Sequence, residues 1–110
     1  MLAVWTGSAD LANLDALVTP DYVGFIGSRR RDLTRLKTDI EAYRAAAPGV
    51  TFSIEHQFRN GDDLATRLAA HRVDAAHPNG ETIRGLNISR WQNGLLAEEW
   101  AIWESFSSAD

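Results

Sequence analysis

The chain has 110 residues, of which 45% are hydrophobic and 24% charged, and this profile predicts one globular domain over residues 1–110. It contains no cysteine, which excludes a disulfide framework, a zinc finger and a thiol nucleophile. The net charge of −4 is the wrong sign for a dedicated nucleic-acid binder. No apolar run approaches the length of a membrane helix, and Met1–Trp5 lacks the basic start of a signal peptide. We therefore expect a cytoplasmic protein that binds neither nucleic acid nor a membrane.

Two helices are predicted in the first half of the chain. The first follows Ser8 and ends at Pro20, with one apolar face formed by Leu11, Leu14, Leu17 and Val18. Because this apolar face starts abruptly, we expect the first helix to lack an N-terminal piece. The second runs from Asp32 to Ala47, with an apolar face formed by Leu33, Leu36, Ile40 and Tyr43. The basic run Arg29–Arg31 between them is predicted to be a solvated loop.

After Gly49 the hydrophobic period changes from 3.6 to 2, which predicts strands. The first runs from Val50 to Phe58 and ends at Asn60-Gly61, a sequence preferred in two-residue type I′ hairpin turns. Three further strands are predicted over residues 63–74, 82–92 and 95–106, separated by turns at Pro78-Asn79-Gly80 and Asn93-Gly94. Helices followed by a meander of about four antiparallel strands indicate the α+β class, with the helices packed on one face of a curved sheet.

The two type I′ turns predict which strand residues face each other. At Asn60-Gly61 the register pairs Ile54 with Arg67, His56 with Ala65, and Val50 with His71. At Asn93-Gly94 it pairs Trp100 with Asn87 and Glu104 with Ile83, and places Trp91 on the same face. Both registers turn ionisable side chains toward the apolar face of the sheet. Such groups must pair, change their pKa or meet water or a ligand, so a lined cavity is expected there.

Each ionisable residue has a structural interpretation beside the functional one. Glu104 is an acid/base residue, an exposed carboxylate near the C-terminus, or a partner of Arg67. His71 is either catalytic or a hydrogen-bonded strand histidine, and His56 lies either in the pocket or at the edge of the core. The three histidines, His56, His71 and His77, lack a metal-ligand spacing, so we predict no metal site.

The C-terminal third of the chain resembles a known family. The residues are Pro78 to Ile83, Gly85 to Leu96 and the run Glu98-Glu99-Trp100-Ala101-Ile102-Trp103-Glu104. This ending is similar to that of SnoaL-like polyketide cyclases, in the nuclear-transport-factor-2-like superfamily. The upstream pieces, Leu14 to Tyr22 and the Asn60-Gly61-Asp62 turn, fit this pattern more loosely.

The resemblance implies a cone-shaped α+β barrel with an apolar pocket, no cofactor, and a homodimer formed through the outer sheet face by Leu86, Ile88, Ala101 and Trp103. It places the family's acid/base residue of an intramolecular aldol closure at Glu104, and a histidine near His71. Substrate binding is assigned to Arg67, Asn87, Trp100, His56, Tyr22 and Trp91. The chain departs from the pattern at Gly24-Phe25, because the family carries a histidine after Asp21-Tyr22-Val23.

Three functions stay open from the sequence. The first is acid/base cyclisation or isomerisation of a hydrophobic, oxygenated small molecule by Glu104 and His71, with Arg67 or Asn87 as an alternative donor for the oxyanion. The second is a ligand-binding or dimerisation module without turnover. The third is epoxide hydrolysis, which needs two carboxylates around an arginine, whereas the predicted inward face offers one of each.

Overall fold

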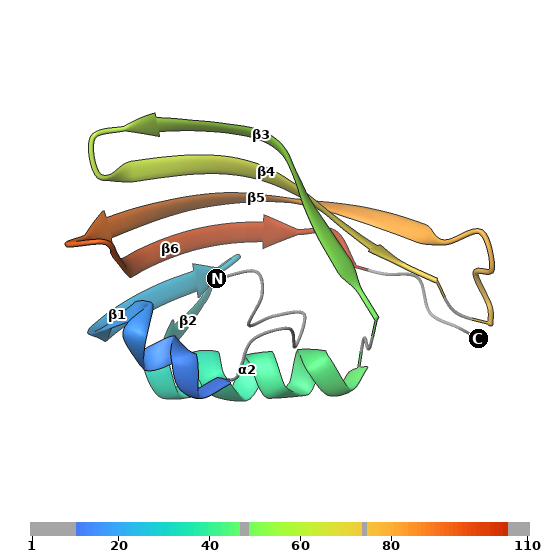
Figure 1. Ribbon diagram of the computed structural model, residues 1–110, viewed down its shortest axis with the longest axis horizontal. Coiled ribbons are helices and arrows are strands. Elements are labelled where there is room, and N and C mark those ends of the chain that lie inside the picture. The colour runs from blue at the N-terminus through green and yellow to red at the C-terminus, as the bar shows by residue number, and fades with distance from the viewer. Residues whose placement is uncertain (1–10, 47–48, 74, 106–110) are drawn as a thin grey trace.

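A curved sheet of six strands arches over one α-helix in the computed structural model, which describes residues 11–46, 49–73 and 75–105 (Figure 1). The elements in chain order are η1 (Leu11–Ala16), β1 (Val18–Ile26), β2 (Arg29–Asp32), α2 (Leu33–Ala46), β3 (Thr51–Asn60), β4 (Asp63–Arg72), β5 (Glu81–Gln92) and β6 (Leu95–Trp103). Their order in the sheet is β2-β1-β6-β5-β4-β3, so β2 and β3 are edges and the barrel is not closed. The α+β class is confirmed, but the sheet has six strands and not about four.

Helix α2 agrees with its prediction. The Asp32 carboxylate accepts a hydrogen bond from the backbone N–H of Arg35 at 2.8 Å, which is the usual way an aspartate caps a helix N-terminus. The helix buries Leu36 and Ile40, two members of the predicted apolar face. Because this face packs against β1 and η1, α2 is held across the concave side of the sheet (Figure 1).

The first predicted helix is mostly wrong. From residue 11, where the described part of the chain begins, a 3-10 turn over Leu11–Ala16 takes the place of the expected α-helix, and the chain becomes a strand at Val18. Val18 pairs with Leu96 in a parallel ladder that is interrupted between Val18 and Val23. Pro20 lies inside this interruption, where its missing N–H costs no ladder hydrogen bond. The predicted start at Ser8 and the residues Met1–Trp5 lie outside the described residues.

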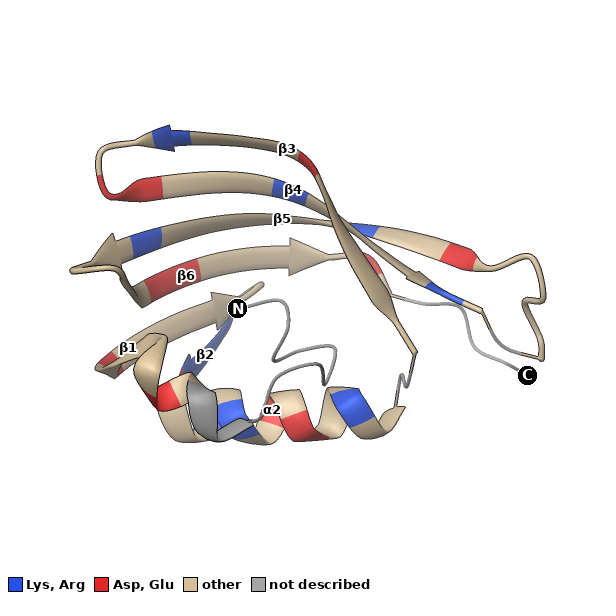
Figure 2. Ribbon diagram, in the orientation of Figure 1, with Lys and Arg blue, Asp and Glu red and all other residues tan. Residues whose placement is uncertain are grey.

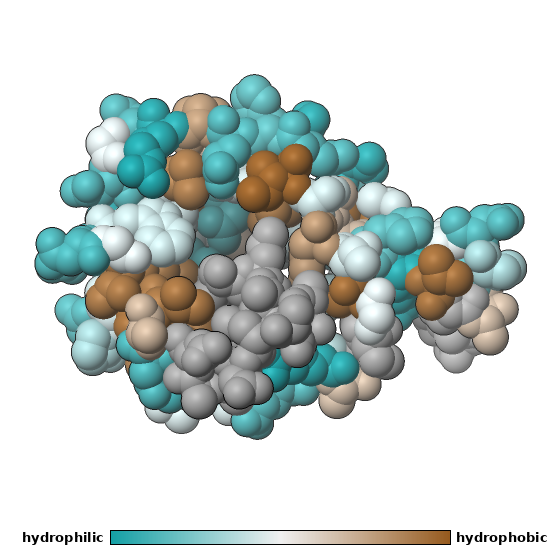
Figure 3. Space-filling view, viewed as in Figure 1, coloured by the Kyte–Doolittle hydropathy of each residue, from teal (hydrophilic) through white to brown (hydrophobic). Residues whose placement is uncertain are grey.

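The four C-terminal strands form the predicted meander, and the Asn93-Gly94 turn is confirmed. Asn93 and Gly94 have φ values of 53° and 81°, and a type I′ turn requires positive φ at both positions. The first turn is displaced by one residue: Asn60 pairs with Asp63, so the two-residue loop is Gly61-Asp62. Hydrophilic residues cover this end of β3 and β4, at the upper left of the space-filling view (Figure 3).

Two register shifts correct the predicted sheet faces. Between β5 and β6 the predicted register holds next to the turn, at Trp91 and Leu96. It shifts by one between Trp91 and Arg90, so farther from the turn Asn87 faces Ala101 and not Trp100. Between β3 and β4 the shift lies between Ile54 and His56. A one-residue shift exchanges the two faces of a strand. The residues placed on the outer face by this exchange are His56, Arg67, His71 and Trp100.

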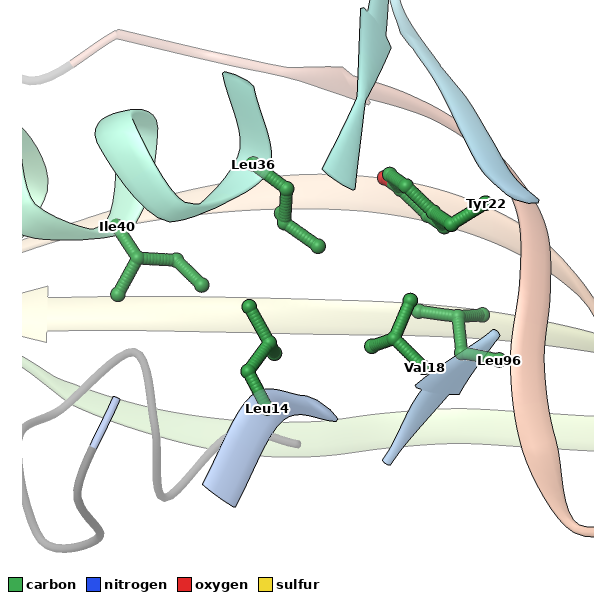
Figure 4. Packing of buried hydrophobic residues seen from close by; sticks show 6 residues of the cluster. All are labelled: Leu14, Val18, Tyr22, Leu36, Ile40 and Leu96. Carbon is green, nitrogen blue, oxygen red and sulfur yellow. The ribbon is translucent and has the colours of Figure 1, made fainter. Parts of the chain in front are cut away.

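The core is divided into two hydrophobic clusters. The larger one joins η1, β1, α2 and β6 through Leu14, Val18, Tyr22, Leu36, Ile40 and Leu96 (Figure 4). The smaller one contains Val50, Ala70 and Ile83, with Tyr43, Phe52 and Trp103 packed against it. None of the described helices is long and apolar enough to span a membrane.

Candidate functional site

A cavity of about 830 Å³ lies between α2 and the inner face of strands β3 to β6. Most of its wall is apolar, with contributions from Tyr43, Phe52, Ile54, Leu64, Leu68, Ile83, Trp91, Leu96 and Trp103. A smaller set of polar side chains interrupts this wall, namely Arg29, Arg31, Asp39, Gln57, Thr66, Asn87, Ser89, Glu99 and Glu104. An apolar hollow with a few convergent polar groups is the usual form of a small-molecule site.

Glu99 is the centre of the polar wall, and its residue surface is only 8% exposed. Its Oε1 accepts hydrogen bonds from the Tyr22 hydroxyl at 2.5 Å and from Nη2 of Arg31 at 2.7 Å. Its Oε2 accepts one from Nδ2 of Asn87 at 3.2 Å. Donors from β1, β2 and β5 therefore fix one carboxylate of β6 in the cavity wall.

Arg31 joins two carboxylates. Its Nη1 lies 3.3 Å from Oδ2 of Asp39, its Nη2 lies 2.7 Å from Glu99, and its Nε donates to the Tyr22 hydroxyl at 3.0 Å. The Arg31 side chain is 7% exposed, so the predicted solvated loop at this position is wrong. We call Tyr22, Arg31, Asp39, Asn87 and Glu99 the Glu99 cluster.

Gly24 leaves the space that this cluster needs. A Cβ atom at Gly24 would lie 2.2 Å from the Tyr22 hydroxyl oxygen and 3.3 Å from Nε of Arg31. Any larger side chain would therefore push the tyrosine or the arginine away from Glu99. The residue that follows Tyr22-Val23 thus has a packing reason to be glycine.

Two side chains of the Glu99 cluster, Tyr22 and Arg31, have pKa values that are shifted by their surroundings. Burial, and then the negative charge of Glu99, raise the pKa of the Tyr22 phenol above its ordinary value of 10.0. Tyr22 therefore stays protonated at neutral pH and donates to the carboxylate. Burial acts to lower the pKa of Arg31, but the adjacent Tyr22 and Glu99 oxygens raise it above its ordinary value, so the guanidinium stays charged.

Besides Glu104, three predicted site residues lie at or beside the cavity. Asn87 and Trp91 line it, and Tyr22 lies behind Glu99, 2% exposed. The indole Nε1 of Trp91 donates to the Ser89 hydroxyl at 2.8 Å, which fixes the ring in the wall. The roles assigned to these residues stay predictions.

Glu104 does not face inward as predicted. Its backbone N–H donates to the carbonyl of Arg84 and not to Ile83, and its Oε2 accepts the backbone N–H of Arg84 at 3.0 Å. The side chain is exposed and lies at the rim of the cavity. Trp100 is 41% exposed on the outer face. The register shift between Arg90 and Trp91 is the reason why Glu104 and Trp100 both differ from their predicted positions.

The remaining predicted residues lie on the outer face of the sheet. Nδ1 of His71 is 2.8 Å from the Thr82 hydroxyl, and Nε of Arg67 is 3.5 Å from the Glu55 carboxylate. His56 is exposed beside Phe58, with ring centroids 6.0 Å apart. None of these three side chains lines the cavity, so the geometry does not bring them together with Glu99.

Sequence reasoning missed Arg31, Asp39 and Glu99. The neighbours of Glu99 in the sequence, Glu98 and Trp100, face outward, and alternation would have selected Glu99 had the register shift been known. No signal in the Arg29–Arg31 run separates the buried arginine from the exposed ones. Among the residues that the structure describes, no three His, Cys, Asp or Glu side chains are grouped to hold a metal ion.

Fold and site together define a small α+β protein with an apolar cavity and a buried carboxylate in its wall. The chain belongs to the SnoaL-like domain family, whose family model matches residues 1–99. No curated protein sequence matches it.

Solved structures support the same fold. A loop-truncation variant of IdmH is similar at 26% identity with a TM-score of 0.81, covering 94% of this chain and 85% of that one. Wild-type IdmH from Streptomyces antibioticus, a candidate polyketide cyclase, has 24% identity, a TM-score of 0.81 and the same coverage. AclR from Streptomyces galilaeus, a candidate hydroxylase, has 15% identity and a TM-score of 0.77, covering 94% of this chain and 82% of that one. The fold is thus nuclear-transport-factor-2-like, with an open sheet.

The raised pKa of Tyr22 predicts a loss of stability in alkali. Above its ordinary pKa of 10.0 the unfolded phenol loses its proton while the native one keeps it, so the free energy of unfolding falls as pH rises. One such group contributes at most about 1.4 kcal/mol per pH unit. Urea unfolding followed by tryptophan fluorescence should give a shallower fall for Tyr22→Phe than for the wild type. Tyr43, whose pKa is also raised by burial, maintains part of the slope in both proteins. Equal slopes would contradict the prediction.

Proposed function

We propose that the cavity binds a hydrophobic, oxygenated small molecule and that Glu99 moves a proton on it, as in acid/base cyclisation or isomerisation. The observation that carries this proposal is the burial of the Glu99 carboxylate in an otherwise apolar wall, hydrogen-bonded to Tyr22, Arg31 and Asn87. Membership of the SnoaL-like family and the likeness to IdmH, a candidate polyketide cyclase, support the reaction type.

Glu99 is suited to act as a base because its two oxygens differ. Oε1 already accepts two hydrogen bonds, from Tyr22 and Arg31, whereas Oε2 accepts one, from Asn87. Nη2 of Arg31 donates to Oε1 at 2.7 Å, so this charge-assisted hydrogen bond falls on Oε1 and not on Oε2. Oε2 is thus the atom that we expect to take the proton from the substrate.

The step that follows is an enolisation. Oε2 removes a proton from a carbon next to a carbonyl, and the negative charge moves to the carbonyl oxygen. Asn87 has a second N–H and Arg31 borders the cavity, so both can donate to that oxygen. In an aldol closure the enolate carbon then bonds to a second carbonyl carbon, and the new alkoxide takes the proton back from Glu99. No cofactor enters this balance.

Glu99→Gln tests the role of the carboxylate. The amide has almost the same shape and can still accept from Tyr22 and Arg31, but it cannot serve as the base. We expect the enzyme-dependent exchange of the α-protons of 2-tetralone in D₂O, followed by proton NMR, to fall by about 10²- to 10⁴-fold. Circular dichroism at rising temperature checks that the variant is folded.

Glu104→Gln separates the two candidate carboxylates. Glu104 is exposed and bonded to the backbone of Arg84, so its amide variant should retain the exchange within about twofold. If Glu104→Gln lost the proton exchange and Glu99→Gln kept it, Glu104 would be the acid/base residue, as predicted from the sequence. If the wild type exchanged no protons but bound 2-tetralone, the non-catalytic binding function would be favoured. The cytoplasmic location stays a prediction.

The arrangement around Arg31 favours a second candidate, epoxide hydrolysis. Asp39 and Glu99 lie on the two Nη atoms of one guanidinium, at 3.3 Å and 2.7 Å, and all three residues line the cavity. One carboxylate would take a proton from water as the water oxygen attacks an epoxide carbon. The other, in its protonated form, would give a proton to the oxygen whose bond to carbon breaks. The product is a diol, and the net change is the addition of one water.

Asp39→Asn tests this second candidate. With styrene oxide in ¹⁸O-labelled water, enzyme-dependent formation of labelled diol should fall by about 10²-fold. Asp15→Asn is the matched control, because Asp15 is 64% exposed and pairs with Lys37 away from the cavity lining. Mass spectrometry of the diol gives the rate. A wild type that makes no more diol than buffer would exclude hydrolysis.

We also propose a homodimer through the outer face of the sheet. The support is a set of exposed apolar side chains on the neighbouring strands β5 and β6 and on the edge strand β3, namely Phe58, Leu86, Ile88, Trp100 and Ile102. The ladder aligns Phe58, Ala65, Ile88 and Trp100 in one row across these strands. Leu86 and Ile88 face outward as predicted, whereas Ala101 and Trp103 line the cavity instead.

The double variant Leu86→Asp and Ile88→Asp should be a monomer where the wild type is a dimer. Two carboxylates in the middle of an apolar interface would have to lose their water on association. Light scattering after gel filtration gives the mass, and one chain has a mass of 12.2 kDa. Val73→Asp is the control, since Val73 is 61% exposed but lies beyond the end of β4. A wild type of one-chain mass would contradict the proposal.

A further inference from the structure

A second, smaller hollow of about 270 Å³ adjoins the cavity. It is lined by Ile26, Arg29, Arg30, Arg31, Arg35 and Asp39, and we call it the arginine hollow. Four of these residues, Ile26, Arg29, Arg31 and Asp39, also line the large cavity. The two spaces therefore share a wall, and a ligand in one can extend into the other.

The arginine hollow carries an excess of positive charge. Its only lining carboxylate, Asp39, is already shared between Arg31 at 3.3 Å and Arg35 at 3.0 Å. Within residues 11–46, 49–73 and 75–105, Arg29 and Arg30 have no carboxylate within ion-pair distance. These guanidinium groups lie together in a chain whose net charge is −4, so the local charge opposes the overall one.

Strand geometry directs Arg29 toward the cavity. Arg29 and Arg31 are two residues apart in β2, so their side chains share one face of the strand. Arg31 reaches Glu99 on that face, and Arg29 lines both spaces. Figure 2 shows β2 in blue beside the first turns of α2. β2 is an edge strand, so among the described strands it has a neighbour, β1, on one side only.

We propose that the arginine hollow binds a singly charged oxyanion of the ligand, such as a carboxylate, whose apolar body occupies the cavity. This inference rests on the proposed function, because it assumes an apolar body in the cavity. A guanidinium group donates two parallel N–H bonds to a carboxylate, and Arg29 supplies such a fork. One such fork matches the two oxygens of a single carboxylate, so a singly charged group of that shape is the ligand end that we expect.

The charged end of the ligand would also orient its reacting part. Arg31 lies between the arginine hollow and Glu99, with its Nη2 2.7 Å from Glu99 Oε1. An anionic group held at Arg29 therefore places the adjoining carbons of the ligand beside the carboxylate. The substrate class that follows is a hydrophobic carboxylic acid with its carbonyl groups toward Glu99.

Two fluorescent probes test the site. 8-Anilinonaphthalene-1-sulfonate carries an apolar body and one sulfonate, and N-phenyl-1-naphthylamine has the same body without the charge. Arg29→Gln should weaken binding of the sulfonate probe by about fivefold to tenfold and leave the neutral probe within about twofold. Arg59→Gln is the control, because it removes the same charge from an exposed residue that lines neither space.

The outcomes separate this inference from the function on which it rests. If the neutral probe binds but the sulfonate probe does not bind, or is insensitive to Arg29→Gln, the anion site is wrong and the apolar cavity stands. An equal loss of the sulfonate probe in Arg59→Gln, or an equal loss of both probes in Arg29→Gln, would also overturn the anion site. If neither probe binds the wild type, both proposals fail.

Discussion

The ion pair between Arg31 and Glu99 is the interaction on which the arrangement of the site depends. Arg31 belongs to the edge strand β2 and Glu99 to β6, and β1 lies between them in the sheet. The pair crosses β1, and both of its members are hydrogen-bonded to the Tyr22 hydroxyl of that strand. Through Asp39 the same guanidinium reaches α2. A short edge strand and a helix are thus joined to the middle of the sheet by one charged side chain.

This ion pair is difficult to explain by stability alone. Removing two charges from water costs several kcal/mol for each ion, and well-packed apolar side chains of similar volume often give an equally stable protein. The surrounding residues reduce that cost, because Tyr22 and Asn87 supply further hydrogen bonds to the carboxylate. A buried charge pair in the wall of an apolar cavity therefore supports the ligand site that we propose.

How far the sequence predicts this structure depends on the distance over which each signal acts. Helix α2 and the four C-terminal strands follow from local periodicity, and the Asn93-Gly94 turn follows from two residues. Strand β1 was missed because Val18 pairs with Leu96, a partner far along the chain that no local pattern reveals. The register shift between Arg90 and Trp91 has no composition signal, and it makes Glu99 the carboxylate buried in the cavity wall, whereas Glu104 lies exposed at the rim.

The same distinction limits what the family can say about activity. IdmH and AclR share this fold at TM-scores of 0.81 and 0.77, yet one is a candidate cyclase and the other a candidate hydroxylase. Because a common backbone accommodates different reactions, the polar side chains in the cavity must decide the chemistry. Here those side chains are one carboxylate with a free lone pair, a second carboxylate on the same guanidinium, and an arginine without an ion-pair partner in the described part of the chain. Enolisation needs only the first of these, hydrolysis needs the second as well, and recognition of an acidic substrate needs the third. The proposed functions therefore differ in which of these three groups the ligand engages.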